Sequence, residues 1–244
     1  MNVLIACEES QRVCMAFRKR GFTAFSADIQ ECSGGHPEWH IHGDVLPYIN
    51  GNCEFTTQSG DIVKIVGKWD LIVAHPPCVN LSVSGARHFE KKRADGSQRE
   101  AIEFFMKFIL ADCPHICVEN PVNIISGDYV KEWFPDLCEK YNLPLKNYQT
   151  ISPHWFGSTT RKKTCYWLKE LPPLRATKIV KPELVTYIKK DGTKSSMSAD
   201  FCRGAGSHDS KQRSKTAPGI AEAMADQWGT WVNNLLEKQK GNKN

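Results

Sequence analysis

The chain has 244 residues, 41% of them hydrophobic, and a formal net charge of +5. This length can bury one substantial core, so we expect a single domain with excursions. The apolar runs stay below the roughly 20 residues of a membrane span, and no basic flank precedes the apolar start of the chain. These features argue against a membrane or secreted protein and predict a cytoplasmic one.

Short apolar runs rich in β-branched residues alternate with stretches that have helical spacing. In chain order the predicted elements are strand 2–7, helix 10–20, strand 23–29, strand 70–75, helix 99–113 and strand 115–120. Strands that are almost continuously apolar and alternate with helices are typical of a parallel sheet covered on both faces. The sequence therefore predicts an α/β fold.

The last third of the chain changes character. Residues 168–212 are rich in Pro, Lys, Gly and Ser and lose the periodicity, which predicts a small inserted region with one hairpin at Asp191-Gly192. Residues 217–239 predict one long amphipathic helix. We therefore divide the chain into a core (1–167), an insertion (168–212) and a C-terminal helix that returns to the core (213–244).

Polar side chains gather where the predicted strands end. In open parallel sheets, ligands bind outside the carboxyl ends of the strands. The polar residues at these ends are Glu8, Glu9, Asp28, His75 to Cys78, Glu119 and Asn120. We expect the binding site at this edge of the sheet.

The ten cysteines are scattered, often inside apolar runs, which predicts reduced thiols rather than disulfides. Four potential zinc ligands lie near one another in the sequence, namely Cys32, His36, His40 and His42. No paired CxxC or HxxxH spacing accompanies them, so we expect no metal.

Basic residues gather in four runs: Lys91–Arg93, Arg161–Lys163, Lys189–Lys194 and Arg203–Lys215. A single run of this kind is usually a solvated face. Because several of the runs flank segments that carry chemically active residues, a polyanionic partner is plausible.

Cys78 directly follows two prolines at the end of a predicted strand. Each proline fixes its own φ and restricts the residue before it, so such a loop aims the thiol in one direction. A thiolate is a strong nucleophile if nearby positive charge lowers its pKa. Glu119, at the end of another strand, could supply a proton to an acceptor held beside the thiol.

Four segments, in this order along the chain, resemble the DNA cytosine-5 methyltransferase family. WDLIVAHPPCVNLS (69–82) resembles the family's cysteine loop, and HICVENPVNII (115–125) resembles its Glu-Asn-Val/Pro motif. Residues 151–168 are similar to the segment with a Gln-x-Arg-x-Arg pattern, and residues 213–229 stand where the family has its closing loop and helix. The resemblance implies a Rossmann-like fold and S-adenosylmethionine-dependent methylation of carbon 5 of cytosine in DNA.

The resemblance also implies roles for single residues. Cys78 would attack carbon 6 of cytosine, Glu119 would engage nitrogen 3, and Arg161 would orient the base and stabilise the thiolate. The implied cofactor-binding positions are Ala6, Cys7, Glu8, Glu9, Asp28, Ile29, Asp44, Val45, His75 and Pro76. The implied positions for cytosine and DNA are Pro77, Asn120, Lys163, Arg203, Arg213 and Lys215. The base would be flipped out of the duplex, and His75 alternatively is a hydrogen-bonded loop histidine.

The chain departs from the family pattern in several places. The first motif lacks glycines (residues 6–13), Val79 and Thr159 stand where the family has glutamine, and Lys163 replaces an arginine. The insertion is also shorter than the family's target-recognition region, which favours a short or relaxed recognition sequence or a substrate other than long duplex DNA. A compact lone methyltransferase of this kind would suit a phage or mobile element and the host cytoplasm. Two alternatives therefore stay open: a nucleic-acid-binding or nucleotide-binding protein without catalysis, and an enzyme that modifies cytosine in nucleotides or single strands.

Overall fold

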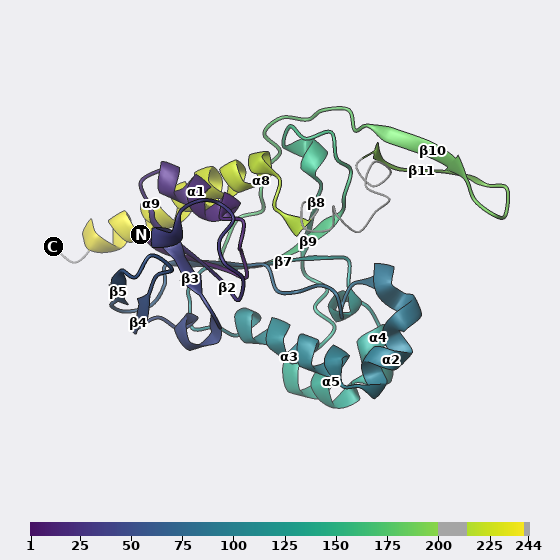
Figure 1. Cartoon of the computed structure of the whole chain (residues 1–244), viewed down its shortest axis with the longest axis horizontal. Helices are drawn as coiled ribbons and strands as arrows, with labels where there is room; N and C mark the ends of the chain where they lie inside the picture. The colour runs from purple at the N-terminus through teal and green to yellow at the C-terminus, as the bar shows by residue number, and fades with distance from the viewer. Residues whose placement is uncertain (200–213, 242–244) are drawn as a thin grey trace.

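The computed structural model describes residues 1–199 and 214–241, and a seven-stranded sheet lies at its centre (Figure 1). The strand order is β3-β2-β1-β6-β7-β9-β8. The strands are β1 (Asn2–Ala6), β2 (Thr23–Asp28), β3 (His40–His42), β6 (Leu71–Ala74), β7 (Ile116–Pro121), β8 (Gln149–Ile151) and β9 (Thr164–Lys169). The first five in the order pair in parallel, and β9 runs antiparallel to both of its neighbours. This is the mostly parallel sheet of a Rossmann-like α/β fold, and the predicted α/β fold class is confirmed.

Helices cover both faces of the sheet (Figure 1). Because successive strand residues point to opposite faces, Val3 and Ile5 pack on one side and Leu4 on the other. The first side holds α1 (Arg12–Lys19), α8 (Pro218–Ala223), a π-helical turn (Met224–Trp228) and α9 (Gly229–Gly241). On the other side of the sheet lie α2 (Phe89–Ala94), α3 (Ser97–Ile109), α4 (Tyr129–Trp133) and α5 (Pro135–Tyr141).

The predicted strands agree with β1, β2, β6 and β7 to within about one residue at each end. The helix predicted over 99–113 is α3, which begins at Ser97 and ends at Ile109. Pro114 accounts only for the helix not reaching the predicted end at residue 113, because proline disfavours helical backbone at the residue before it. The predicted C-terminal helix is present, but a π-helical turn divides it.

The hairpin expected at Asp191-Gly192 is confirmed. Strands β10 (Leu184–Ile188) and β11 (Lys194–Ser198) pair antiparallel and extend away from the core (Figure 1). The structure also contains a hairpin that the sequence analysis missed, formed by β4 (Cys53–Thr56) and β5 (Ile62–Ile65). Short 3-10 turns lie at Pro37–Trp39, Leu46–Tyr48, Val83–His88, Ile124–Ser126 and Pro153–Trp155. No helix in the described ranges is long and apolar enough to cross a bilayer.

Candidate active site

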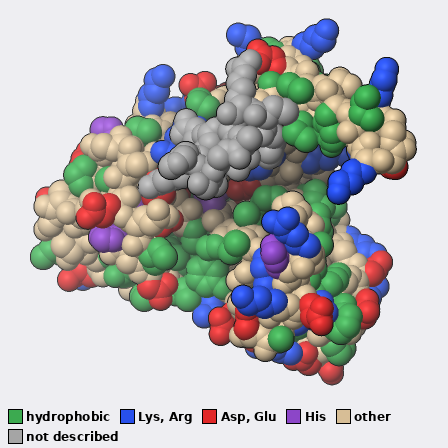
Figure 2. All heavy atoms as spheres, turned by 45° about the vertical axis from the view of Figure 1, so that its right-hand side comes forward, with side chains coloured by type: hydrophobic (Ala, Val, Ile, Leu, Met, Phe, Trp, Pro, Cys, Tyr) green, Lys and Arg blue, Asp and Glu red, His purple; other side chains and the backbone are tan. Residues whose placement is uncertain are grey.

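A cavity of about 240 Å³ opens beside the carboxyl ends of β1, β2, β6 and β7, the edge that the sequence predicts. Predicted site residues that line it are Cys7, Glu8, Glu9, Asp28, His75, Pro76, Pro77, Cys78, Glu119, Asn120 and Lys215. The sulfur-bearing Cys78 and the carboxyl-bearing Glu119 therefore share one pocket. Figure 2 shows a cleft across this part of the molecule, with Lys and Arg side chains on both sides of it.

The loop that carries Cys78 is anchored to the neighbouring strand. The amide of Asn120, which is only 1% exposed, donates to the Pro76 carbonyl at 2.7 Å. Asn123 in turn donates to the Asn120 side-chain oxygen at 3.0 Å. The Cys78 carbonyl accepts the N–H groups of the turn that follows. Asn120 was predicted to contact substrate; the structure instead uses both ends of its side chain to hold the cysteine loop.

Burial raises the pKa of the half-buried Cys78 thiol, and the Glu119 carboxylate raises it further. The ammonium groups of Lys162 and Lys92 act in the opposite direction without reversing the shift. Strong nucleophilicity would require a lowered thiol pKa, and the groups around Cys78 in the described structure raise it instead.

Glu119 forms an ion pair with His75. The His75 Nδ1 lies 3.0 Å from Glu119 Oε2, and the two side chains are 11% and 16% exposed. Burial lowers the pKa of His75, but the hydrogen bond and charge of Glu119, together with the charge of Glu8, outweigh it, so the net pKa is raised. The alternative of a fully hydrogen-bonded loop histidine is wrong, because the buried Nε2 has no partner among residues 1–199 and 214–241.

The loop after β1 replaces the missing glycines with side-chain contacts. Cys7 and Gln11 both adopt positive φ, near 59° and 56°, a region that favours glycine. Gln11 holds the loop by bonding the backbone carbonyl and N–H of His36 at 2.8 and 3.0 Å. Glu8 accepts the N–H groups of Val13 and Cys14 and so caps α1. Glu8 therefore lines the pocket and also stabilises the helix start, since both of its carboxylate oxygens accept backbone N–H groups.

The remaining predicted cofactor residues separate into two groups. Asp28 lines the pocket and uses Oδ1 to accept the Gln30 N–H at 2.9 Å. The structure places the others outside the pocket lining: Ala6 and Val45 in the core, Asp44 on the surface and Ile29 with 77% of its side chain exposed. These positions could meet only a ligand that extends beyond the cavity.

Of the basic run Arg161–Lys163, the residue that lines the pocket is Lys162, which the sequence analysis missed. The Arg161 guanidinium instead bonds the backbone and hydroxyl oxygens of Ser196 on β11, at 3.0 and 3.2 Å. Lys163 is exposed and lies outside the pocket lining. The family pattern assigns roles to the first and third residues of this run, but in the structure the middle residue is the one that lines the pocket. The roles predicted for Arg161 and Lys163 are thus not supported by their positions.

Lys215 also differs from its predicted role. It was expected to contact phosphates, but its Nζ lies 2.9 Å from Ser33 Oγ and 3.8 Å from Glu9 Oε1, inside the pocket, with 18% of its side chain exposed. Arg203 and Arg213, predicted for the same purpose, lie outside the described residues.

The potential zinc ligands have other partners. Both ring nitrogens of His40 are hydrogen bonded, to Ser26 and to the Gln30 carbonyl, and His36 pairs with Glu38. Within the ranges that the structure describes, no group of three or more His, Cys, Asp or Glu side chains is placed to hold a metal ion.

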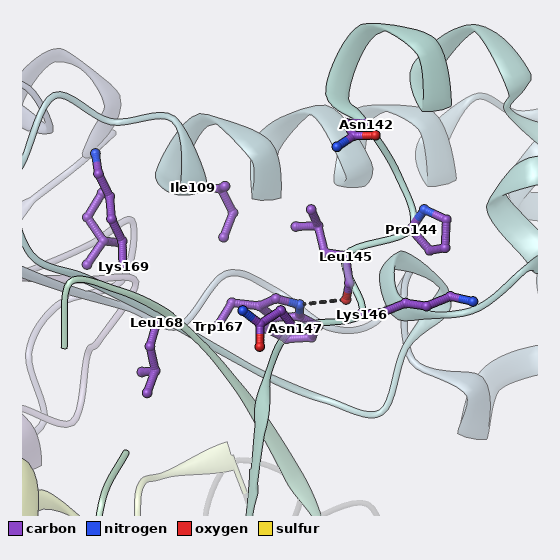
Figure 3. A pocket seen from close by; sticks show the side chains of 10 residues that line it. Ile109, Asn142, Pro144, Leu145, Lys146, Asn147, Trp167, Leu168 and Lys169 are labelled. Atoms are coloured by element: carbon purple, nitrogen blue, oxygen red, sulfur yellow. Dashed lines mark hydrogen bonds between the residues drawn. The ribbon is translucent and has the colours of Figure 1, made fainter. Parts of the chain in front are cut away.

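A second cavity, of about 320 Å³, lies near the amino end of β7 (Figure 3). Its wall includes Ile109, Leu145 and Trp167, and the Trp167 indole donates to the Leu145 carbonyl at 3.0 Å. Among the described residues, those that line it include two lysines but no Cys, His, Asp or Glu. It therefore offers neither a nucleophilic thiol nor an acid, and the chemistry lies at the opposite edge of the sheet.

The fold and the pocket define a Rossmann-like α/β protein with a thiol, a carboxyl and an imidazole at one ligand-binding edge. No protein-family model and no curated protein sequence matches the chain. Among solved structures it is similar to the Dnmt2 methyltransferase of S. pombe, with 14% identity and a TM-score of 0.36, over 69% of this chain and 48% of that chain. The chain thus spans about half the length of that structure. The fold class follows from the strand order and pairing, which do not depend on this likeness.

Replacing Asn120 by alanine is expected to lower the free energy of unfolding by about 2 kcal/mol, because the Pro76 carbonyl and the Asn123 amide lose buried partners. Chemical denaturation measures this change. Asn147→Ala, at an exposed position, is the control and should change stability by less than about 0.5 kcal/mol. Equal stabilities for both variants would contradict the anchoring role.

Proposed function

We propose that this protein is an S-adenosylmethionine-dependent methyltransferase that modifies carbon 5 of cytosine in DNA through a covalent adduct on Cys78. The observation that carries the proposal is that Cys78 and Glu119, from the ends of two adjacent parallel strands, line the same pocket. A pyrimidine between them would meet a nucleophile and a proton donor at once.

The acidic side of the pocket suits the proposed cofactor. S-adenosylmethionine carries an ammonium and a sulfonium group, and Glu9 and Asp28 bring carboxylates to the ends of β1 and β2. Asp28 keeps its second oxygen for a ribose hydroxyl. When bound, the cofactor supplies an electrophilic methyl group. The cavity is smaller than the roughly 300–1,000 Å³ of typical small-molecule sites, so we infer that Lys215 leaves Glu9 when the cofactor enters.

The side chains of this chain would act as follows. The Cys78 thiol releases its proton to water and its sulfur bonds to carbon 6, while Glu119 donates a proton to nitrogen 3 so that the ring does not carry negative charge. After carbon 5 has gained the methyl group, it loses its proton to water. The bond from carbon 6 to sulfur then breaks, and the nitrogen 3 proton returns to Glu119. The cysteine is thereby restored.

A nucleic acid is the substrate class that the charge distribution favours. Lys91, Lys92 and Arg93 lie on α2, and Lys189, Lys190 and Lys194 lie on the β10–β11 hairpin. Basic side chains are visible on both sides of the cleft (Figure 2). Phosphate contacts on two sides would hold a strand while one base enters the pocket.

The direct test follows a labelled methyl group from S-adenosylmethionine into duplex DNA, single-stranded DNA and free cytosine nucleotides. We expect 5-methylcytosine in digested duplex DNA. Transfer to single strands or nucleotides alone would keep the chemistry and change the substrate. Absence of transfer to all three, with salt-dependent DNA binding retained, would indicate a binding protein and contradict the proposal.

Replacing Lys162 by methionine is expected to slow methyl transfer. The Lys162 ammonium lowers the pKa of Cys78, so its loss raises that pKa and leaves less thiolate at a given pH. The rate of Cys78 alkylation, followed by mass spectrometry across pH, should shift to higher pH. Lys163→Met is the matched control and should leave the alkylation profile in place. The same profile in both variants would contradict the assignment.

A further inference from the structure

The His75 Nε2 atom is buried and has no hydrogen-bond partner among residues 1–199 and 214–241. Burying a polar atom without a partner costs free energy, so such an atom calls for a reason. His75 lies at the end of β6, and its backbone N–H bonds the Ala6 carbonyl on β1 at 2.9 Å. The ring is therefore held between β1 and β7 at the floor of the pocket.

The groups around His75 come from every neighbouring element. Glu119 on β7 faces Nδ1 directly, Glu8 approaches from the loop after β1, Lys162 from the segment before β9, and the Cys78 thiol from the same loop. Two carboxyls and one ammonium surround the ring. A proton on the imidazole is thus favoured over a proton lost to solvent.

The hydrogen bond also decides which oxygen of Glu119 can carry a proton. With a proton on His75 Nδ1, this nitrogen donates to Oε2 at 3.0 Å, and that oxygen is then occupied as an acceptor. A proton on the carboxyl must then sit on Oε1, which has no hydrogen bond within the described ranges and is the oxygen left to face a ligand. Without His75, either oxygen could carry the proton.

We propose that His75 is a positioning residue for Glu119: its Nδ1–H holds Oε2, so the acid proton sits on Oε1, the oxygen left to face a ligand. This inference rests on the proposed function. Nε2 takes no part in this contact, because it is buried and has no partner among the described residues. His75 and Glu119 therefore take up and lose a proton as a coupled pair.

A test that does not depend on activity uses protein with ¹⁵N-labelled histidine. The His75 signal, assigned by its loss in His75→Asn, should show the Nδ1–H tautomer when neutral. In Glu119→Gln the His75 titration should move to lower pH, because the hydrogen bond to the carboxylate and its charge raise the His75 pKa. An Nε2–H tautomer, or a titration unchanged by Glu119→Gln, would overturn the inference whether or not the protein methylates DNA.

The second arm measures the pH dependence of single-turnover methyl transfer. His75→Asn can keep an N–H near the Nδ1 position but cannot take up a proton, so the alkaline limb should move to lower pH. His115→Asn is the matched control, since His115 is also buried and bonds the Asp70 carbonyl through Nδ1, but lies at the opposite edge of the sheet. If His75→Asn were slower but its pH profile unchanged, His75 would have only a structural role and the inference would be contradicted. A wild-type protein that transfers no methyl group would instead contradict the proposed function.

Discussion

Replacing Cys78 by serine is expected to reduce methyl transfer by at least about 10³-fold. A serine hydroxyl is a far weaker nucleophile than a thiolate and would need a general base to activate it. His75 cannot serve as that base through Nδ1, because this nitrogen is already hydrogen bonded to Glu119. The measurement is single-turnover transfer of labelled methyl to DNA. With DNA that carries 5-fluorocytosine, wild-type protein should form a covalent adduct, because carbon 5 then has no proton to lose.

The control for this experiment is Cys53→Ser. Cys53 is also partly buried and has a raised thiol pKa, but it lies in the β4–β5 hairpin and outside the pocket. It should retain both transfer and adduct formation. If Cys78→Ser still transferred methyl groups at a comparable rate, the covalent mechanism would be refuted even though the fold and the cofactor could be as proposed.

Replacing Glu119 by glutamine is expected to lower methyl transfer by about 10² to 10⁴-fold, the usual loss when a general acid is removed. The same change should make Cys78 more reactive toward an alkylating reagent, because the Glu119 carboxylate raises the pKa of that thiol. Removing the negative charge lowers the pKa, so more thiolate is present at a given pH. The two measurements should therefore move in opposite directions.

A merely destabilised variant would not produce this pair of results. Loss of structure would expose all the thiols and would increase alkylation at every cysteine, which peptide mass spectrometry distinguishes from a change at Cys78 alone. Glu103→Gln on α3, where the carboxylate pairs with the exposed Lys140, is the charge-matched control and should change neither rate. Slower alkylation in Glu119→Gln would contradict the electrostatic role assigned to the carboxylate.

At this site the sequence motifs were located correctly, but the roles predicted for some of their residues were not. The cysteine loop and the Glu-Asn-Pro segment were both expected at one sheet edge, and both line one pocket there. Asn120 belongs to the same motif, yet its amide is occupied by Pro76 and Asn123. The sequence motif predicts that a residue lies near the site. The hydrogen-bond partners of its side chain in the folded protein decide which of its polar atoms can still bind a ligand.

By itself, the amino-acid sequence determined the parallel strands and the edge at which their ends meet. Continuous apolar runs such as 2–7 and 70–75 are typical of strands in a sheet that is covered on both faces. Pro76 and Pro77 end the second run, because proline has no N–H group to donate to a neighbouring strand. Only the tertiary structure decided that Lys162 rather than Arg161 enters the pocket and that His75 pairs with Glu119. The physical reason is that a side chain's direction and charge depend on groups far away in the chain, such as Ser196 for Arg161 and Glu119 for His75, which local patterns do not encode.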